Sequence, residues 1–241
     1  MNDRSTHVSR PIPAEPMEVF EGYSYSQTNP RATYSPWFDD KEFMQVYGVI
    51  QSSTLIDMYR LYELWTLAES SNRVGGDIVE VGVWRGGSGC LLAYKDQALN
   101  QGTSSVFLCD TFEGVVKAGA EDSHYIGGEH DDTDSDSVNA LARQLGVGNT
   151  KILKGIFPDD TGEQLAGRRI RMVHIDVDVY DSAKDIVHFL WPLIPVGGVV
   201  VFDDFGGYKT NGVTKLVNKL RKELPCLFFH NLNGHGILVK M

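Results

Sequence analysis

Short apolar runs alternate with segments of helical periodicity from residue 77 to the end of the chain. Five runs have the length and composition of buried strands: DIVEVG, SVFLCD, TKILKG, RMVHID and GGVVVFDD. Four segments follow helical spacing: CLLAYKDQAL, residues 138–146, AKDIVHFLWPLI and TKLVNKLRKEL. Because strands alternate with helices, the pattern predicts an α/β fold with a mostly parallel, doubly wound sheet. Such a sheet binds ligands at the carboxyl ends of its strands.

The two ends of the chain differ from this pattern. The tail LFFHNLNGHGILVK predicts two strands joined at Asn233-Gly234. Residues 1–35 are rich in Pro, Ser, Thr and Asn, and we expect a flexible arm with little secondary structure. Residues 36–73 predict two helices, the first beginning near Lys41 with Asp39 or Asp40 as its cap. Their apolar positions recur at helical intervals: Phe43, Val46, Tyr47 and Ile50, then Leu55, Met58, Tyr62 and Trp65. We therefore expect one domain over residues 36–241, which includes these two helices.

Composition narrows the class of partner. The hydrophobic fraction is 42% and the charged fraction 22%, as in ordinary globular proteins, and the net charge is −10. This charge disfavours nucleic acid and anionic membranes as partners. The N-terminus has no apolar signal core, and no apolar run approaches the roughly 20 residues that span a bilayer. Cys90, Cys109 and Cys226 lack metal-binding or paired spacing, so we expect free thiols and a cytoplasmic location.

A glycine-rich turn follows the first predicted strand. Gly82 ends the strand, and Gly86 and Gly87 let the backbone approach a ligand before a helix begins. The spacing is not G-x-G-x-x-G, which disfavours a dinucleotide and a dehydrogenase and better fits the methionine part of S-adenosylmethionine. Asp110 ends the second strand, where a carboxylate suits a ribose diol. A plain turn and a loop or cap carboxylate are the alternative interpretations.

Carboxylates follow the fourth and fifth predicted strands. Asp176 and Asp178 follow one strand, and Asp203 and Asp204 follow the other. Because parallel strands end at the same edge, these groups would repel one another unless a cation were bound. Oxygen ligands favour magnesium, calcium or manganese over zinc. Some of these residues could instead cap helices, although Asp181 or Ser182 would serve equally well for the helix near Ala183.

The histidines and the acidic stretch give weaker indications of function. His174 and His188 lie in apolar runs, where packing is the default role, and His124 and His130 fall in an acidic loop where solvation is the default. His235, between two glycines of the terminal hairpin, could approach a ligand. The acidic stretch of residues 121–136 is a solvated loop or, within residues 113–136, a mobile lid over the substrate.

Taken together and in order, four motifs resemble the macrocin O-methyltransferase family, whose members methylate sugar hydroxyls in antibiotic biosynthesis. They are GDIVEVGVWRGGSG, LCDTFEG, HIDVDVYDS and GGVVVFDDF. The stretch SPWFDDKEFMQVYGVIQSSTLIDMYRLYELW is similar to the family's N-terminal helices. The resemblance covers residues 36–240 and includes one conservative departure, because the family's first strand often reads Glu-Cys-Gly where this chain has Glu80-Val81-Gly82. Residues 113–136 match no family positions.

The resemblance implies a class I methyltransferase fold, a Rossmann-like, mostly parallel sheet with an antiparallel last strand, preceded by N-terminal helices. It implies that Glu80, Gly82 and Ser88 line the methionine end of S-adenosylmethionine, and that Asp110 holds its ribose. Trp84, Thr111, Phe112 and Asp176 complete the expected cofactor-binding set. It further implies that Asp176, Asp203 and Asp204 bind Mg²⁺, and that Asp176 is also the general base, although a role as ligand alone stays open. A homo-oligomer is expected on the same ground.

The predicted function is therefore an S-adenosylmethionine- and Mg²⁺-dependent O-methyltransferase that acts on a hydroxyl of a small molecule, a sugar of a natural product. Two alternatives remain. A catechol- or phenol-type O-methyltransferase would use the same metal carboxylates. A non-catalytic S-adenosylmethionine-binding protein would keep only the cofactor pocket.

Overall fold

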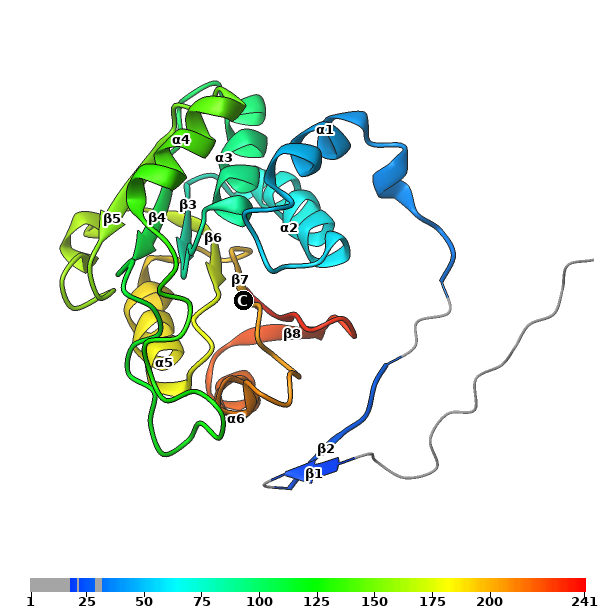
Figure 1. Cartoon of the computed structure of the whole chain (residues 1–241), viewed down its shortest axis with the longest axis vertical. Coiled ribbons are helices and arrows are strands. Elements are labelled where there is room, and N and C mark those ends of the chain that lie inside the picture. The colour runs from blue at the N-terminus through cyan, green and yellow to red at the C-terminus, as the bar shows by residue number, and fades with distance from the viewer. Residues whose placement is uncertain (1–17, 21, 29–31) are drawn as a thin grey trace, which may run out of the picture. The chain divides into compact units, whose positions relative to one another are not determined.

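The computed structural model describes residues 18–20, 22–28 and 32–241, and the chain divides into two units between Ala32 and Thr33. In the first unit, β1 (Glu18–Phe20) pairs antiparallel with β2 (Tyr23–Tyr25). This short hairpin is regular structure in a stretch for which the sequence predicts little. Residues 1–17, 21 and 29–31 of the predicted arm lie outside the described residues. Figure 1 labels the helices and strands of the described part.

The second unit is built on a seven-stranded sheet with the order β5-β4-β3-β6-β7-β9-β8. β9 alone runs in the direction opposite to the other six strands of this sheet, as the resemblance implies. The paired registers align Val81 with Cys109 and with Ile175, so neighbouring parallel strands end at one edge. The strands are β3 (Asp77–Val81), β4 (Val106–Asp110), β5 (Thr150–Lys154), β6 (Ile170–Ile175), β7 (Val199–Phe202), β8 (Cys226–His230) and β9 (Gly236–Lys240).

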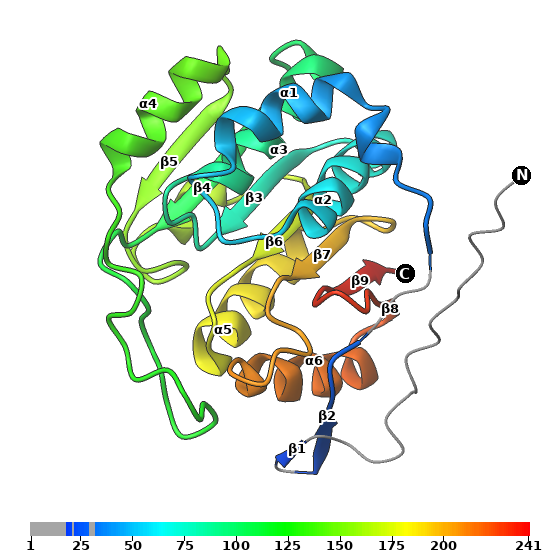
Figure 2. The same cartoon turned by 45° about the vertical axis from the view of Figure 1, so that its right-hand side comes forward.

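Six α-helices cover the two faces of this sheet (Figure 2). Four of them pack on one face with strand side chains such as Ile78 and Leu108, and two pack on the other with Val79 and Val173. This alternation along a strand gives two apolar cores. The first group is α1 (Lys41–Ile50), α2 (Met58–Ser71), α3 (Gly87–Asn100) and α4 (Ser135–Leu145); the second is α5 (Tyr180–Leu190) and α6 (Asn211–Glu223). Single 3-10 turns are Pro36–Phe38, Asn72–Val74, Gly162–Leu165 and Trp191–Leu193.

Helix ends show where local signals worked. Asp40 caps α1 by accepting from the Phe43 backbone N–H at 2.9 Å, as predicted. The suggested caps Asp181 and Ser182 are wrong, because both lie inside the first turn of α5, whose N-cap is Val179. The predicted helix over residues 183–194 is also too long, since α5 ends at Leu190 and Pro192 lies in the 3-10 turn that follows.

Two further observations concern the cysteines and the helices. Cys90, Cys109 and Cys226 are all free thiols, and the first two are buried, as predicted. Among the residues that the structure describes, no helix combines the length and the apolar character needed to cross a membrane.

Candidate functional site

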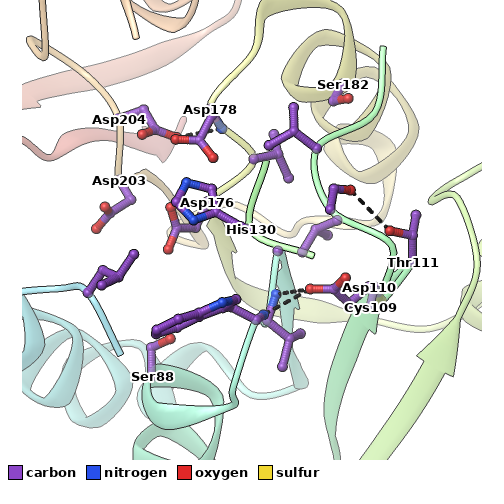
Figure 3. Close-up of a pocket in the computed structure, with 18 of the residues that line it drawn as sticks. Ser88, Cys109, Asp110, Thr111, His130, Asp176, Asp178, Ser182, Asp203 and Asp204 are labelled. Atoms are coloured by element: carbon purple, nitrogen blue, oxygen red, sulfur yellow. Dashed lines mark hydrogen bonds between the residues drawn. The ribbon is translucent and has the colours of Figure 1, made fainter. Parts of the chain in front are cut away.

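A cavity of about 300 Å³ opens at the carboxyl ends of β3, β4, β6 and β7. Ligand sites of doubly wound sheets lie at this edge. Figure 3 shows the carboxylates of Asp176, Asp178, Asp203 and Asp204 gathered in one part of the pocket, with Ser88 and Asp110 below them in the view. Predicted site residues that line the cavity are Gly82, Trp84, Ser88, Asp110, Thr111, Asp176, Asp203 and Asp204.

The glycine turn brings the end of β3 against the end of β6. Gly82 has φ +88°, and a Cβ atom there would fall 1.7 Å from the Asp176 carbonyl oxygen, so no other residue fits. Gly86, also with a positive φ, is the N-cap of α3, and Ser88 lies in the first turn of that helix. The positive end of the helix dipole therefore borders the cavity.

Asp110 organises the same turn through hydrogen bonds that the sequence does not reveal. Its Oδ2 accepts the backbone N–H groups of Val83 and Trp84 at 2.6 and 2.9 Å, and its Oδ1 accepts that of Phe112 at 2.7 Å. A carboxylate has about four acceptor positions, so about one remains for a ligand. Asp110 is thus a structural anchor of the turn as well as part of the cavity wall.

Two predicted cofactor residues, Glu80 and Phe112, are not among the residues that line the cavity. Glu80 is fully buried; its Oε1 lies 2.9 Å from His174 Nδ1, and its Oε2 has no hydrogen-bond partner. Phe112 packs in the core that contains α3 and α4. The structure therefore brings Glu80 and Phe112 behind the cavity wall rather than onto it.

The carboxylates at the other end of the cavity form a compact cluster. Asp176, Asp203 and Asp204 each offer an oxygen within 4.8 Å of the others. Asp178 joins them, because its backbone N–H donates to Asp204 Oδ2 at 2.9 Å. Burial, followed by repulsion from neighbouring carboxylates, raises the pKa of Asp176 and of Asp204 well above the ordinary value. Such a cluster of hard oxygen donors suits a divalent cation such as Mg²⁺.

Asp203 has the opposite electrostatic environment. Burial alone would raise its pKa, but His174, His235 and the Arg60 guanidinium lower that pKa well below its usual range. Arg60 Nη1 donates to Asp203 Oδ2 at 2.5 Å, and His235 Nε2 lies 2.9 Å from Asp203 Oδ1. Asp203 is therefore already compensated by the protein, whereas Asp176 and Asp204 are not.

Residues 113–136 fold over the cavity, and Val115, Tyr125 and His130 from this segment line it. Asp132 fixes the segment to the glycine turn, with its oxygens 2.7 Å from Trp84 Nε1 and 2.5 Å from Arg85 Nη2. Burial and the neighbouring carboxylate of Asp178 raise the pKa of the Tyr125 phenol. The mobility predicted for this lid stays a prediction.

Several site residues have no distinct signal in the sequence. Arg60 and Tyr125 belong to an ordinary amphipathic helix and an acidic loop. His130, for which solvation is the default, has φ +64° and lines the cavity. His235 is fully buried beneath Asp203, and only its place between two glycines of a predicted hairpin hinted at a close approach.

A family model and several known proteins are similar to this chain. Residues 28–225 match the family model described as Macrocin-O-methyltransferase (TylF). The chain is 30% identical over 164 residues to the 8-demethyl-8-(2,3-dimethoxy-alpha-L-rhamnosyl)-tetracenomycin-C 4'-O-methyltransferase of Streptomyces olivaceus, covering 63% of this chain and 62% of that protein. It is 29% identical over 164 residues to the demethyldecarbamoylnovobiocin O-methyltransferase of Streptomyces niveus, with the same two coverages, 63% and 62%. The chain thus spans less than two thirds of the length of these relatives.

A solved structure, that of the O-methyltransferase NovP, superposes with a TM-score of 0.66 at 23% identity, covering 78% of this chain and 82% of that chain. At this identity the likeness shows the fold alone. The predicted class I methyltransferase fold is confirmed.

Proposed function

We propose, from the premise that the chain belongs to the macrocin-O-methyltransferase (TylF) family, that it is an S-adenosylmethionine- and Mg²⁺-dependent O-methyltransferase. Its acceptor in this proposal is a hydroxyl of a small molecule, a sugar of a natural product made in antibiotic biosynthesis. The observation that carries the proposal is the cluster of Asp176, Asp203 and Asp204 in one cavity with the glycine turn of β3.

The residues present fit both groups. For the cofactor, Gly82, Trp84, Ser88, Asp110 and Thr111 line one continuous cavity that reaches the carboxylates. For the ion, Asp176, Asp203 and Asp204 are the proposed ligands, and the raised pKa values of Asp176 and Asp204 indicate two charges that the surrounding protein does not balance. When bound, the two groups supply a methyl carbon activated by a sulfonium and a Lewis acid that makes a nearby hydroxyl more acidic.

The chain's own residues align the acceptor and move its proton. We assign Asp176 as the base that takes the proton of the acceptor hydroxyl at a carboxylate oxygen. A carboxylate that also binds a cation is a weaker base, so Asp178 is the second candidate, because it lines the same cavity without being one of the three proposed ligands. Trp84 and the folded segment with Tyr125 exclude water from the reacting groups, and the cavity wall supplies the alignment.

The proposal extends to the cellular context. The free, partly buried thiols fit a reducing compartment, so we propose a cytoplasmic location. A homo-oligomer is proposed from the family resemblance.

Calorimetry and an acceptor panel test the function. Titration with S-adenosylmethionine, with and without Mg²⁺, is expected to show cofactor binding in both cases. A panel of glycosides, catechols and phenols, analysed by mass spectrometry, is expected to give a mass increase of one methyl group for glycosides. Methylation of vicinal aromatic diols alone would favour the catechol-type alternative. Cofactor binding with no product on any acceptor would favour the non-catalytic alternative, and absence of cofactor binding would contradict the proposal.

A further inference from the structure

The Asp203 carboxylate contacts two side chains that are far apart in the sequence, Arg60 and His235. Arg60 belongs to α2, and His235 belongs to the connection between β8 and β9. Arg60 Nη1 reaches Oδ2 of Asp203 at 2.5 Å and its carbonyl oxygen at 3.3 Å. His235 Nε2 lies 2.9 Å from Oδ1. Both carboxylate oxygens are therefore fixed by side chains that do not belong to β7, the strand that Asp203 follows.

Each of the two donors is itself fixed by a carboxylate of α2. Arg60 Nε donates to Asp57 Oδ2 at 2.7 Å, and Asp57 is also the N-cap of that helix. On the other side, His235 Nδ1 lies 2.6 Å from Glu63 Oε2. Because both donors are held at their far ends, the orientation of the Asp203 carboxylate is determined by α2.

The β8–β9 connection is tied to α2 by two further hydrogen bonds. Asn231 Nδ2 donates to Glu63 Oε2 at 2.7 Å, and Asn233 Nδ2 donates to Asp57 Oδ1 at 2.8 Å. The same two carboxylates thus hold both the donors of Asp203 and the loop that carries His235. At the centre of this arrangement His235 has no exposed surface, whereas Asp57 and Glu63 are partly exposed.

We propose that Arg60 and His235 are positioning residues for the divalent-ion site, which act by fixing the carboxylate of Asp203. The inference rests on the proposed function, in which Asp203 is a ligand. After these contacts Oδ2 of Asp203 keeps a lone pair for an ion, whereas Oδ1 also has His174 Nε2 at 3.6 Å. Arg60 and His235 set the direction of the Oδ2 lone pair. Hydrogen-bond partners of metal ligands contribute in this way to metal affinity, and their loss typically costs about 10- to 100-fold.

A matched pair of substitutions at His235 separates position from charge. In His235→Gln the amide can still donate to Asp203 from a place close to that of Nε2. In His235→Asn the shorter side chain reaches Glu63 but not Asp203. Both remove any charge of the ring, and each keeps one of its two contacts: the Gln variant keeps the one to Asp203, and the Asn variant keeps the one to Glu63. His188→Ala, at an exposed position of α5, is the control for loss of a histidine elsewhere.

The experiment measures Mn²⁺ binding to the full-length protein by electron paramagnetic resonance, with S-adenosylmethionine affinity measured separately by calorimetry. We expect His235→Asn to weaken Mn²⁺ binding about 10- to 100-fold. His235→Gln and His188→Ala are expected to stay close to wild type, and cofactor affinity is expected to be unchanged in all three. Arg60→Lys, which keeps the charge but loses the fork between Asp57 and Asp203, is expected to weaken Mn²⁺ binding as well.

Three results would overturn the inference. One is equal Mn²⁺ affinity in wild type and His235→Asn. If that variant only melts at a lower temperature, His235 supports the fold and does not position the ion site. Another is tighter binding in both His235 variants, which would make charge decisive. The third is a wild-type protein that binds no Mn²⁺ but still binds S-adenosylmethionine, which would remove the ion site and leave the cofactor pocket. Failure of the proposed function looks different: the wild type would bind Mn²⁺ but would neither bind S-adenosylmethionine nor transfer a methyl group.

Discussion

The two ends of the cavity satisfy their carboxylates in different ways. At the end formed by β3 and β4, the Asp110 carboxylate accepts three backbone N–H groups and needs no further partner to hold the glycine turn. At the end formed by β6 and β7, Asp176 and Asp204 are half-buried and face other carboxylates, and this desolvation and repulsion raise the pKa of both. The carboxylate of the first end has its hydrogen-bond partners within the protein, whereas those of the second end are the proposed ligands of a cation.

At the end of the cavity formed by β6 and β7, one of the carboxylates, that of Asp203, does have compensating partners within the protein. Its charge is balanced by Arg60 and its position is fixed by His235, although it lies beside Asp204 in the sequence and beside Asp176 in space. The comparison therefore separates one oriented carboxylate from two uncompensated ones. Substitutions at Asp176, Asp204 and Asp110 separate the contributions of these carboxylates.

The largest effect is expected for Asp176→Asn. The variant loses the proposed base and one charged ligand, so kcat should fall by about 10²- to 10⁴-fold. Affinity for S-adenosylmethionine should be nearly unchanged, because the turn of β3 that forms the other end of the cavity is intact. Steady-state kinetics and calorimetry measure the two quantities, with Asp181→Asn on α5 as control. Turnover near the wild-type rate would remove Asp176 from the mechanism, and a greater loss in Asp178→Asn would transfer the role of base to Asp178.

A smaller effect is expected for Asp204→Asn, which should weaken metal binding but stabilise the metal-free protein. Removing this charge should weaken Mn²⁺ binding at least about tenfold, since fewer charged oxygens remain. Without metal, the variant should melt at a higher temperature than the wild type, because repulsion between neighbouring carboxylates is relieved. Mn²⁺ titration and thermal melts with a chelator test both parts. A variant that is destabilised without metal would contradict the idea that Asp204 is uncompensated.

At the other end of the cavity, Asp110→Asn should act on the cofactor and not on the ion. An amide cannot accept three N–H groups in the same geometry, so the free energy of unfolding should fall by roughly 1–3 kcal/mol. Affinity for S-adenosylmethionine should fall with it, while Mn²⁺ affinity is retained. Chemical denaturation and the two binding assays provide the comparison. A loss of Mn²⁺ affinity as large as the loss of cofactor affinity would show that the two ends are not independent.

The smallest effect is the pH dependence of stabilisation by Mg²⁺. A carboxyl whose pKa is raised in the folded protein stabilises the fold at low pH, and this contribution is lost as the pH rises through the folded pKa. Metal-free protein should therefore lose stability as Asp176 and Asp204 ionise, and Mg²⁺ should raise the melting temperature more at about pH 7.5 than at about pH 5.

Comparing melts with and without Mg²⁺ at the same pH controls for other groups. One is His174, where burial alone would lower the pKa but Asp203 and Glu80 raise it to about 10. Its stabilising contribution is lost as the pH rises from its unfolded value through the folded pKa, in both melts alike. The lowered pKa of Asp203 acts only below the ordinary carboxyl range. An equal effect of Mg²⁺ at both pH values would contradict the prediction.

Much of the architecture follows from the sequence because its signals are local. The alternating pattern predicts the order of strands and helices, and parallel pairing then brings the ends of β6 and β7, with Asp176, Asp203 and Asp204, to one edge. The glycine turn is likewise predictable, since Gly82 has a close approach that excludes a Cβ atom.

The details that set the chemistry are not local. Arg60 contacts a residue 143 positions away, and no periodicity in α2 distinguishes it from an exposed arginine. His235 and His174 appear as packing or turn residues in the sequence, but their ring nitrogens face carboxylates from three different elements. The placement of Glu80 behind the cavity wall depends on Gly89 of α3, whose missing side chain leaves room for the carboxylate. Such features require the assembled fold.

In our proposal, Asp176, Asp203 and Asp204 hold one divalent ion at the edge of the cavity. The most direct test is the anomalous scattering of Mn²⁺ in crystals grown with S-adenosylhomocysteine. The account predicts a single Mn²⁺ peak within about 2.0–2.3 Å of oxygens from all three residues, with the sulfur of the cofactor product in the same cavity. A cavity without a peak, or an ion held instead by His174 and His235, would contradict it.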